Sequence, residues 1–312
     1  MKISLRKLGA FALLVILSLL IIGIWDPSEP RYEGRRLSDW ARDVVAPEVS
    51  DEAFLSIEKS AIESRRKHDN AVAAIQHIGV RALPTALKLC QAKDFWFQEK
   101  LEGWAEARNL DIHLSSAQDR QIEGATIIEV LGPTAKPIIP DLIKLFQNEY
   151  PNVADEASFA LRGIGPEAVA PLIQAFTNSD DPRVQLYAAY SLGLFGSKAR
   201  EAVPILAASL QDKSRRNFVA EALGRIGEDA PTVVPLLAQC LQLEANQNFY
   251  RAIERFGTNA QPAVPTLVRI IDSRRHDYLS ALSALHKINP RLADSYFAQL
   301  GIGLTNQPAI SP

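Results

Sequence analysis

The side chains that most often bind metals or act as nucleophiles are few in this sequence and are scattered along it. None of the five histidines has metal-ligand spacing, and none is followed by glutamate: His68, His77, His113, His276 and His286. The sequence has no glycine-rich phosphate loop, no Gly-x-Ser-x-Gly turn and no cluster of cysteine and histidine. We therefore expect no catalysis, no bound metal and no cofactor. An active site assembled from scattered residues is the alternative.

The two cysteines, Cys90 and Cys240, are too few for a disulfide scaffold. They fall in the first and fifth copies of the repeat described below, and stacked helix layers advance by roughly 8–10 Å each. A disulfide needs Cα atoms within about 7 Å, so the two cannot pair. Other copies have mostly apolar residues at the position of Cys240: Leu145, Phe176 and Ile270, but also Ser209. We expect both cysteines to be core side chains, with a reactive or ligand role as the alternative.

An insert at about 91–121 carries one group of candidate binding residues. It contains Phe95, Trp96, Phe97 and Trp104 among charged residues. An insertion in a regular array maps to one face and often customises binding, and aromatic side chains are enriched in hot spots. Trp96 and Trp104 are therefore candidate partner contacts. The alternative is that the insert packs its own helix back onto the array.

A second group of candidates consists of Lys144, Gln239 and Arg269, each four residues after a recurrent proline. Ala175 and Ala208 take the same position in two further copies. We expect these residues to form a column along the second helices of the repeats, on the concave side of the array. Such a surface suits an extended peptide or a protein edge, although it equally suits plain solvent.

One phrase that recurs between residues 70 and 290 positions these candidates. At Ala222–Ala230 it reads small residue, aliphatic, two variable positions, large apolar residue, glycine, two variable positions, alanine. Six copies carry the glycine: Gly79, Gly132, Gly165, Gly196, Gly227 and Gly257. A seventh has Asn289 in its place. From Gly132 onward the glycines recur every 30 to 33 residues, which is typical of a solenoid.

Each part of the phrase has a structural role. The apolar residues share one helix face, and glycine suits the left-handed residue that ends a helix, with Asn289 as the second choice at that position. Four copies have a proline eight residues later, which suits the first turn of the next helix: Pro140, Pro204, Pro235 and Pro265. Pro171 comes two positions early, which predicts a shorter turn. Each copy is therefore a helix–turn–helix unit that needs its neighbours to bury its apolar faces.

This pattern resembles HEAT repeats, in the short form of the bilin-lyase-like group. The resemblance implies an all-α fold, an α-solenoid of about seven helix–turn–helix repeats. It implies a protein that binds other macromolecules, and a bilin or tetrapyrrole lyase-like activity as the alternative.

The first 25 residues predict a membrane anchor. Lys2, Arg6 and Lys7 precede an uncharged apolar run of 18 residues, Leu8 to Trp25. As a helix this run measures roughly 27 Å, close to the ~30 Å hydrocarbon thickness. No small-x-small cleavage site follows it, so we favour an uncleaved anchor over a cleaved signal peptide or a buried helix. The basic residues place the N-terminus in the cytoplasm and the repeats on the extracytoplasmic or periplasmic side of the inner membrane.

The segment after the run leads into the array. We expect a solvated tether at 26–36, capping helices at 37–69, repeats at 70–300 and a flexible tail at 301–312.

Tyr32–Trp40 resembles the opening of bacterial membrane-tethered HEAT-repeat proteins. In it we expect Ser38 to be a helix N-cap, and Leu37 and Trp40 to cover the first repeat, with peptide recognition as the alternative. The basic cluster Arg65–His68 suits a helix C-terminus, with phosphate contact as the alternative.

Charge and composition narrow the function further. The apolar fraction of 47% suits a folded core, and the formal charge of −2 gives no bulk attraction to nucleic acid. We therefore predict a membrane-anchored, non-catalytic scaffold that binds an unknown protein or peptide. A further alternative is nucleic-acid binding through four loop arginines: Arg215, Arg216, Arg274 and Arg275.

Overall fold

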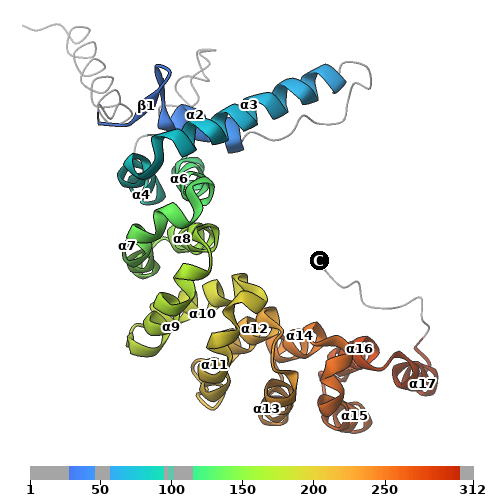
Figure 1. The fold of residues 1–312 in the computed structure, drawn as a ribbon. Coiled ribbons are helices and arrows are strands. Elements are labelled where there is room, and N and C mark those ends of the chain that lie inside the picture. The colour runs from blue at the N-terminus through green and yellow to red at the C-terminus, as the bar shows by residue number, and fades with distance from the viewer. Residues whose placement is uncertain (1–27, 46–56, 95–97, 99, 101–114, 303–312) are drawn as a thin grey trace, which may run out of the picture. The chain divides into compact units, whose positions relative to one another are not determined.

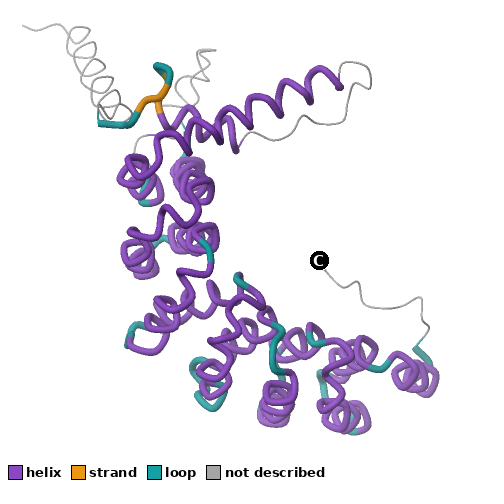
Figure 2. The backbone as a smooth tube through the Cα atoms, viewed as in Figure 1, coloured by secondary structure: helices purple, strands orange, loops and turns teal. Residues whose placement is uncertain are grey.

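The computed structural model describes residues 28–45, 57–94, 98, 100 and 115–302 (Figure 1). It divides into two compact units, Met1–Thr85 and Ala86–Pro312. The described residues are helical except for turns and one two-stranded hairpin (Figures 1 and 2). The expected all-α architecture is therefore confirmed for the part of the chain that the structure describes.

The first unit opens with a hairpin rather than a tether. Strands β1 (Arg31–Tyr32) and β2 (Arg35–Arg36) pair antiparallel and lead directly into α2 (Leu37–Val45). The expectation of a solvated tether is therefore wrong for residues 31–36, which form this hairpin.

The hairpin also changes how the helix begins. Because α2 starts at Leu37, Ser38 lies inside it, and the prediction of Ser38 as N-cap is wrong. The Glu29 carboxylate instead accepts a hydrogen bond from the Ser38 backbone N–H, at 2.6 Å. A carboxylate at this end of a helix is stabilised by the helix dipole.

Trp40 ties the hairpin to the helices of the first unit. Its Nε1 donates to the Tyr32 carbonyl at 3.2 Å, and the Arg35 guanidinium carbon lies 3.9 Å from its ring centroid. Tyr32 in turn lies 4.6 Å from the ring of His77, on α3 (Ile57–Ile78). Leu37 and Trp40 are buried, as a cover over the first repeat requires.

Helix α3 runs without a break through the expected domain boundary at 69/70. Arg65–His68 therefore lies exposed in mid-helix, and the prediction of a helix C-terminus there is wrong. The helix continues because no glycine or proline interrupts it and its next apolar residues are buried: Ala71, Ala74, Ile75 and Ile78.

The second unit is an array of paired helices in two layers (Figure 1). The inner layer holds the first helix of each pair: α6 (Ala117–Leu131), α8 (Pro151–Ile164), α10 (Pro182–Leu194), α12 (Arg216–Ile226), α14 (Gln247–Arg255) and α16 (Tyr278–Ile288). The outer layer holds α7 (Ile139–Lys144), α9 (Val169–Asn178), α11 (Val203–Ser209), α13 (Ala230–Leu243) and α15 (Val264–Asp272). The last pair ends with α17 (Pro290–Leu300), and α4 (Leu83–Cys90) contains the boundary between the units.

Every glycine of the repeated phrase has a positive φ, as predicted. Gly227 is left-handed, at φ 71° and ψ 12°. Gly132, at φ 53° and ψ −132°, lies in a region that is essentially restricted to glycine. Asn289 differs: its φ is −142°, so the prediction of a left-handed residue there is wrong. Its side chain instead caps the next helix by accepting from the Leu292 N–H at 3.2 Å.

Three of the four predicted prolines do start a helix. Pro140, Pro204 and Pro265 lie in the first turns of α7, α11 and α15, after 3₁₀ turns at Gly132–Ile138, Gly196–Ala202 and Gly257–Ala263. Pro235 instead lies inside α13, because that helix already begins at Ala230 with Pro231 in its first turn. Before α9 the 3₁₀ turn is the shorter Pro166–Ala168, as Pro171 predicted.

The array bends within this unit, and the inner layer lines the inside of the bend (Figures 1 and 2). Neighbouring inner helices contact each other more extensively than neighbouring outer helices do. Glycines allow this approach: a Cβ added to Gly163 would lie 2.7 Å from the Glu129 Cα, and one added to Gly224 would lie 2.6 Å from the Ala252 Cα. The expectation that second helices line the concave side is therefore wrong, because small residues bring the first helices closest together.

Both cysteines are buried and free, which confirms the core prediction. Burial raises the pKa of the Cys90 thiol to about 12 and also raises that of Cys240, so neither is a ready nucleophile. In the described residues no helix is both long and apolar enough to cross a membrane. The predicted anchor at 8–25 lies outside those residues, as does the tail from 303 on.

Candidate functional site

The sequence-predicted site residues do not come together. Trp96 and Trp104 lie outside the described residues. Lys144, Gln239 and Arg269 are exposed, but they lie on α7, α13 and α15 of the outer layer. Lys144 also forms an ion pair with Asp141 of its own helix at 2.8 Å. These three side chains therefore face away from the inside of the bend.

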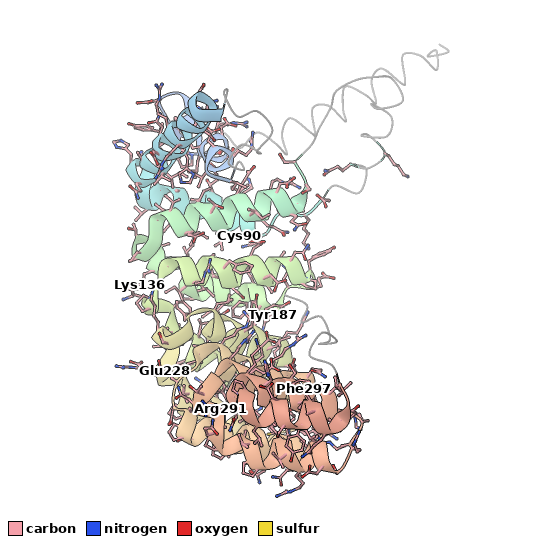
Figure 3. The ribbon with its side chains drawn as sticks, turned by 90° about the vertical axis from the view of Figure 1, so that its right-hand side faces the viewer. Cys90, Lys136, Tyr187, Glu228, Arg291 and Phe297 are labelled. Atoms are coloured by element: carbon pink, nitrogen blue, oxygen red, sulfur yellow. The ribbon has the colours of Figure 1, made fainter. Side chains whose placement is uncertain are left out.

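A different set of side chains occupies the inner layer. We use the name inner face for ten of the exposed or half-buried residues of α8, α10, α12 and α14: Asp155, Glu156, Phe159, Tyr187, Tyr190, Phe218, Glu221, Arg225, Arg251 and Arg255. Arg162, Arg183, Leu186 and Glu254 are further exposed or half-buried positions of the same helices. The buried positions of each helix pack against its neighbours, so these positions point to the open side. Figure 3 views the molecule from this side: Tyr187 lies among the inner helices, away from the edge where Lys136 and Glu228 mark the turns.

Aromatic side chains form the centre of the inner face. Phe159, Tyr187, Tyr190 and Phe218 come from three consecutive inner helices and are each half-buried. The ring of Tyr187 stacks on that of the buried Phe146 with centroids 5.7 Å apart, which fixes its position. Half-buried aromatic rings with one open side are the usual anchors of protein interfaces.

Two carboxylates lie on one side of this centre. Asp155 and Glu156 are half-buried on α8, and among the described residues neither has a hydrogen-bond or ion-pair partner. Burial raises the pKa of Asp155; burial and the neighbouring Asp155 raise that of Glu156. Burial and then Asp155 and Tyr190 raise the pKa of Tyr187, whereas Arg183 lowers it. Two carboxylates without a hydrogen-bond or ion-pair partner therefore lie on the helix that carries Phe159.

Arginines lie on the other side of the centre. Arg225 bonds Glu221 through Nη2 at 2.8 Å, so it is anchored. Arg251 and Arg255 have no hydrogen-bond or ion-pair partner among the described residues. Burial, and then the charge of Arg225, lower the pKa of Arg255, so these guanidinium groups lie close enough to repel one another. This end of the inner face favours an anion.

The sequence does contain a signal for these aromatic residues. Phe159 and Tyr190 each lie six residues before the glycine of their copy, and Tyr187 and Phe218 each lie nine before. Equal offsets within a repeat predict equal positions on the array. No local sequence pattern indicates which of the two helix layers is open to a partner.

Three of the four arginines considered for nucleic-acid binding are engaged within the protein. Arg215 pairs with Asp212 at 2.8 Å, and Arg216 is buried. Arg275 pairs with Asp277 at 2.6 Å and donates to the Leu241 carbonyl at 2.8 Å. Arg274 alone of the four is exposed, and it lies 5.8 Å from the centroid of the Tyr278 ring. These residues therefore do not form a basic stripe.

Within the described part of the chain, no group of three or more His, Cys, Asp or Glu residues could hold a metal ion. The family model for HEAT repeats matches two overlapping stretches, residues 139–218 and 169–255. These stretches begin at α7 and end with α14, so they include the helices of the inner face. No curated protein matches the chain.

Proposed function

Because this chain is a HEAT-repeat protein, we propose that it is a non-catalytic scaffold that binds another protein through its inner face. The observation that carries the proposal is the row of half-buried aromatic rings between opposite charges on α8 to α14. Fold alone does not specify a function, whereas the residues of this surface do indicate one.

The composition of the inner face supports a binding role. Half-buried carboxylates with raised pKa values, such as Asp155 and Glu156, destabilise the free protein. Groups that cost stability are retained where function needs them. Half-buried aromatic side chains next to such groups are typical of contact residues rather than of a surface that meets only water.

We further propose that residues 8–25 hold the scaffold in the inner membrane, with the array on the extracytoplasmic side. The support is the uncharged run of 18 residues and the basic residues before it, Lys2, Arg6 and Lys7. A protein held at a membrane surface searches for its partner near that surface, which suits a scaffold without an activity of its own.

The test is proximity labelling in the native cell, with the labelling enzyme fused after Pro312. Three proteins are compared: the wild type, an inner-face variant with Phe159→Ala and Tyr190→Ala, and an outer-layer variant with Lys144→Ala, Gln239→Ala and Arg269→Ala. We expect extracytoplasmic neighbours in the wild type and in the outer-layer variant, and their loss in the inner-face variant. Circular dichroism of each protein checks that the helices are retained.

Equal labelling by all three proteins would contradict a role for the inner face. Loss in the outer-layer variant alone would restore the sequence-based column as the binding surface. Labelling of cytoplasmic proteins would contradict the proposed topology. A spectral shift on adding bilin or haem to the purified protein would instead favour the tetrapyrrole alternative.

A further inference from the structure

The inner face carries opposite charges at its two ends. Its α8 end has Asp155 and Glu156, and its far end has Arg225 on α12 with Arg251 and Arg255 on α14. Glu221 bonds Arg225 at 2.8 Å, and its charge also favours the charged form of Arg255. Asp155 and Glu156 at one end, and Arg251 and Arg255 at the other, have no hydrogen-bond or ion-pair partner among the described residues. Glu254 of α14 is the nearest acidic neighbour of Arg251 on the same helix, and the arginine favours its charged form.

One ring contact and two pairs of interacting charges relate the successive helices of the inner face. The charge of Asp155 on α8 raises the pKa of Tyr187 on α10, and Tyr190 of the same helix raises it further. The Arg225 guanidinium of α12 lies 5.1 Å from the Tyr190 ring centroid. The charge of Arg225 lowers the pKa of Arg255 on α14, and that of Glu221 raises it. Both ends lie on first helices of neighbouring repeats, on the inside of the bend, so we expect a single bound segment to reach both.

The spacing of the helices fixes the length of such a segment. Three steps from α8 to α14, at roughly 8–10 Å each, span about 25–30 Å. An extended chain rises about 3.3 Å per residue, so about eight residues cover this distance. A helical segment rises about 1.5 Å per residue and needs about twice as many residues.

We propose that the inner face binds an extended peptide segment of a protein partner that carries opposite charges about eight residues apart. A lysine or arginine of this segment lies on Asp155 and Glu156, and an aspartate or glutamate lies on Arg251 and Arg255. An aromatic or aliphatic side chain between them packs among Phe159, Tyr187, Tyr190 and Phe218. This inference rests on the proposed scaffold function and adds the chemistry of the partner.

Charge complementarity decides between this occupant and the chain's own tail. Residues 303–312 contain no basic side chain, so the tail cannot satisfy Asp155 and Glu156. A segment with only basic residues meets repulsion from Arg251 and Arg255, and one with only acidic residues meets repulsion from Asp155 and Glu156. Only a segment with both charges satisfies both ends.

The test is a selection of phage-displayed random twelve-residue peptides on the full-length chain in detergent micelles. We expect the enriched peptides to carry Lys or Arg and Asp or Glu about eight positions apart, on either side of an aromatic or aliphatic residue. The same selection on a variant with Asp155→Asn and Glu156→Gln loses the preference for the basic residue only. On a variant with Arg251→Gln and Arg255→Gln it loses the preference for the acidic residue only. Matched controls on outer surfaces, Glu201→Gln and Arg269→Gln, keep both preferences.

The affinity of one selected peptide then tests direct contact. Each charge-removing variant weakens its binding about threefold to tenfold, as does replacing the matching peptide charge by glutamine. Combining the two changes adds little further loss, because residues in contact are not additive.

Several outcomes overturn the proposal: no enrichment, enrichment without the charge pattern, or additive losses in the combined changes. Mixing two tagged copies of the chain tests the remaining occupant, a second copy. Self-association that is lost with Arg251→Gln and Arg255→Gln also overturns the proposal. If any of these results occurs while the protein still labels partners in cells, the charge pattern is wrong but the scaffold function stands. Failure of this proposal is therefore distinguishable from failure of the proposed function.

Discussion

Arg225 of α12 lies over the ring of Tyr190 of α10, with its guanidinium carbon 5.1 Å from the ring centroid. Its stem lies against Gly193, since a Cβ added there would meet the Arg225 Cδ at 3.1 Å. A glycine on one helix therefore makes room for the arginine of the next. The same contact joins the aromatic centre of the inner face to its basic end.

We predict that Gly224→Ala destabilises the array by about 2 kcal/mol, although alanine is the better helix former by about 1 kcal/mol. The added Cβ would lie 2.6 Å from the Ala252 Cα, so α12 and α14 must separate. At Gly193 the added Cβ would lie 3.1 Å from the flexible Arg225 Cδ and 3.2 Å from the Ala222 Cα. A smaller shift relieves these contacts, so Gly193→Ala costs less than about 1 kcal/mol.

Urea unfolding followed by circular dichroism measures both changes, and hydrogen exchange locates the loosened helices. We expect faster exchange in α12 and α14 for Gly224→Ala. Gln118→Ala, at an exposed position of α6, serves as a control with an effect within about 0.5 kcal/mol. A Gly224→Ala protein as stable as the wild type would show that the inner helices are not in close contact.

Glu156→Gln is predicted to raise the melting temperature at pH 7 while it weakens partner binding. Burial and Asp155 raise the pKa of Glu156, so its charged form is disfavoured in the folded state. The penalty is complete well above the folded pKa, and it disappears as the pH falls through that value. The difference in melting temperature between variant and wild type should therefore shrink on acidification.

Scanning calorimetry at pH 7 and pH 4.5 checks this prediction, with Glu201→Gln as the matched control on an exposed turn. The expected gain at pH 7 is at most about 0.5 kcal/mol, because the group is only half-buried. A variant that is less stable than the wild type at pH 7 would mean that Glu156 has a stabilising partner.

Local features of this fold follow from the sequence, and non-local ones do not. The repeated phrase correctly predicts helix pairs and the positive φ at Gly132 or Gly227, because helix ends depend on neighbouring residues. Gly193 and Gly224 occupy variable positions of the phrase, and their role appears only against the next helix. The direction of the bend, and hence which layer is open, depends on those contacts.

Competition between residues for the same position explains why three helix-end predictions are wrong. Ser38 is a good N-cap by type, but Glu29, nine residues earlier, reaches the same helix end through the hairpin. Asn289 tolerates a left-handed conformation, yet its side chain gains a hydrogen bond by capping α17 instead. Proline at position 235 suits a first turn, but Pro231 starts that helix earlier. Propensity is a prior that a specific contact overrides.

Arg275, Asp277 and Tyr250 form a network that we predict to be structural. The Tyr250 hydroxyl donates to the Asp277 carboxylate at 2.5 Å, and Arg275 bonds the same carboxylate at 2.6 Å. Although burial opposes it, these bonds lower the pKa of Asp277 below 3.8. Asp277→Asn leaves Arg275 without its ion-pair partner and costs about 2 kcal/mol at neutral pH.

The pH dependence of unfolding tests whether Asp277 stabilises the fold through this network. The stability from Asp277 is present above pH 3.8 and is lost as the pH falls through its lowered pKa, so the variant and the wild type converge in acid. Urea midpoints measured between pH 7 and pH 3 follow this convergence. Glu201→Gln, at an exposed position of a turn, is the control. A destabilisation that is constant across this range would contradict the assignment.

We predict that the apolar run at 8–25 holds the protein in the membrane. Leu14→Arg together with Leu17→Arg places two charges near its middle, and each costs about 3 kcal/mol in a membrane helix. We expect the variant to move from the carbonate-resistant membrane pellet to the supernatant. The matched control, Ser4→Arg with Leu5→Arg, adds the same charges before the run, next to Arg6, and should stay in the pellet because basic residues favour the cytoplasmic side. A wild-type protein found in the supernatant would contradict the anchor, whereas loss of the control from the pellet would mean that charge on residues 1–7 governs retention.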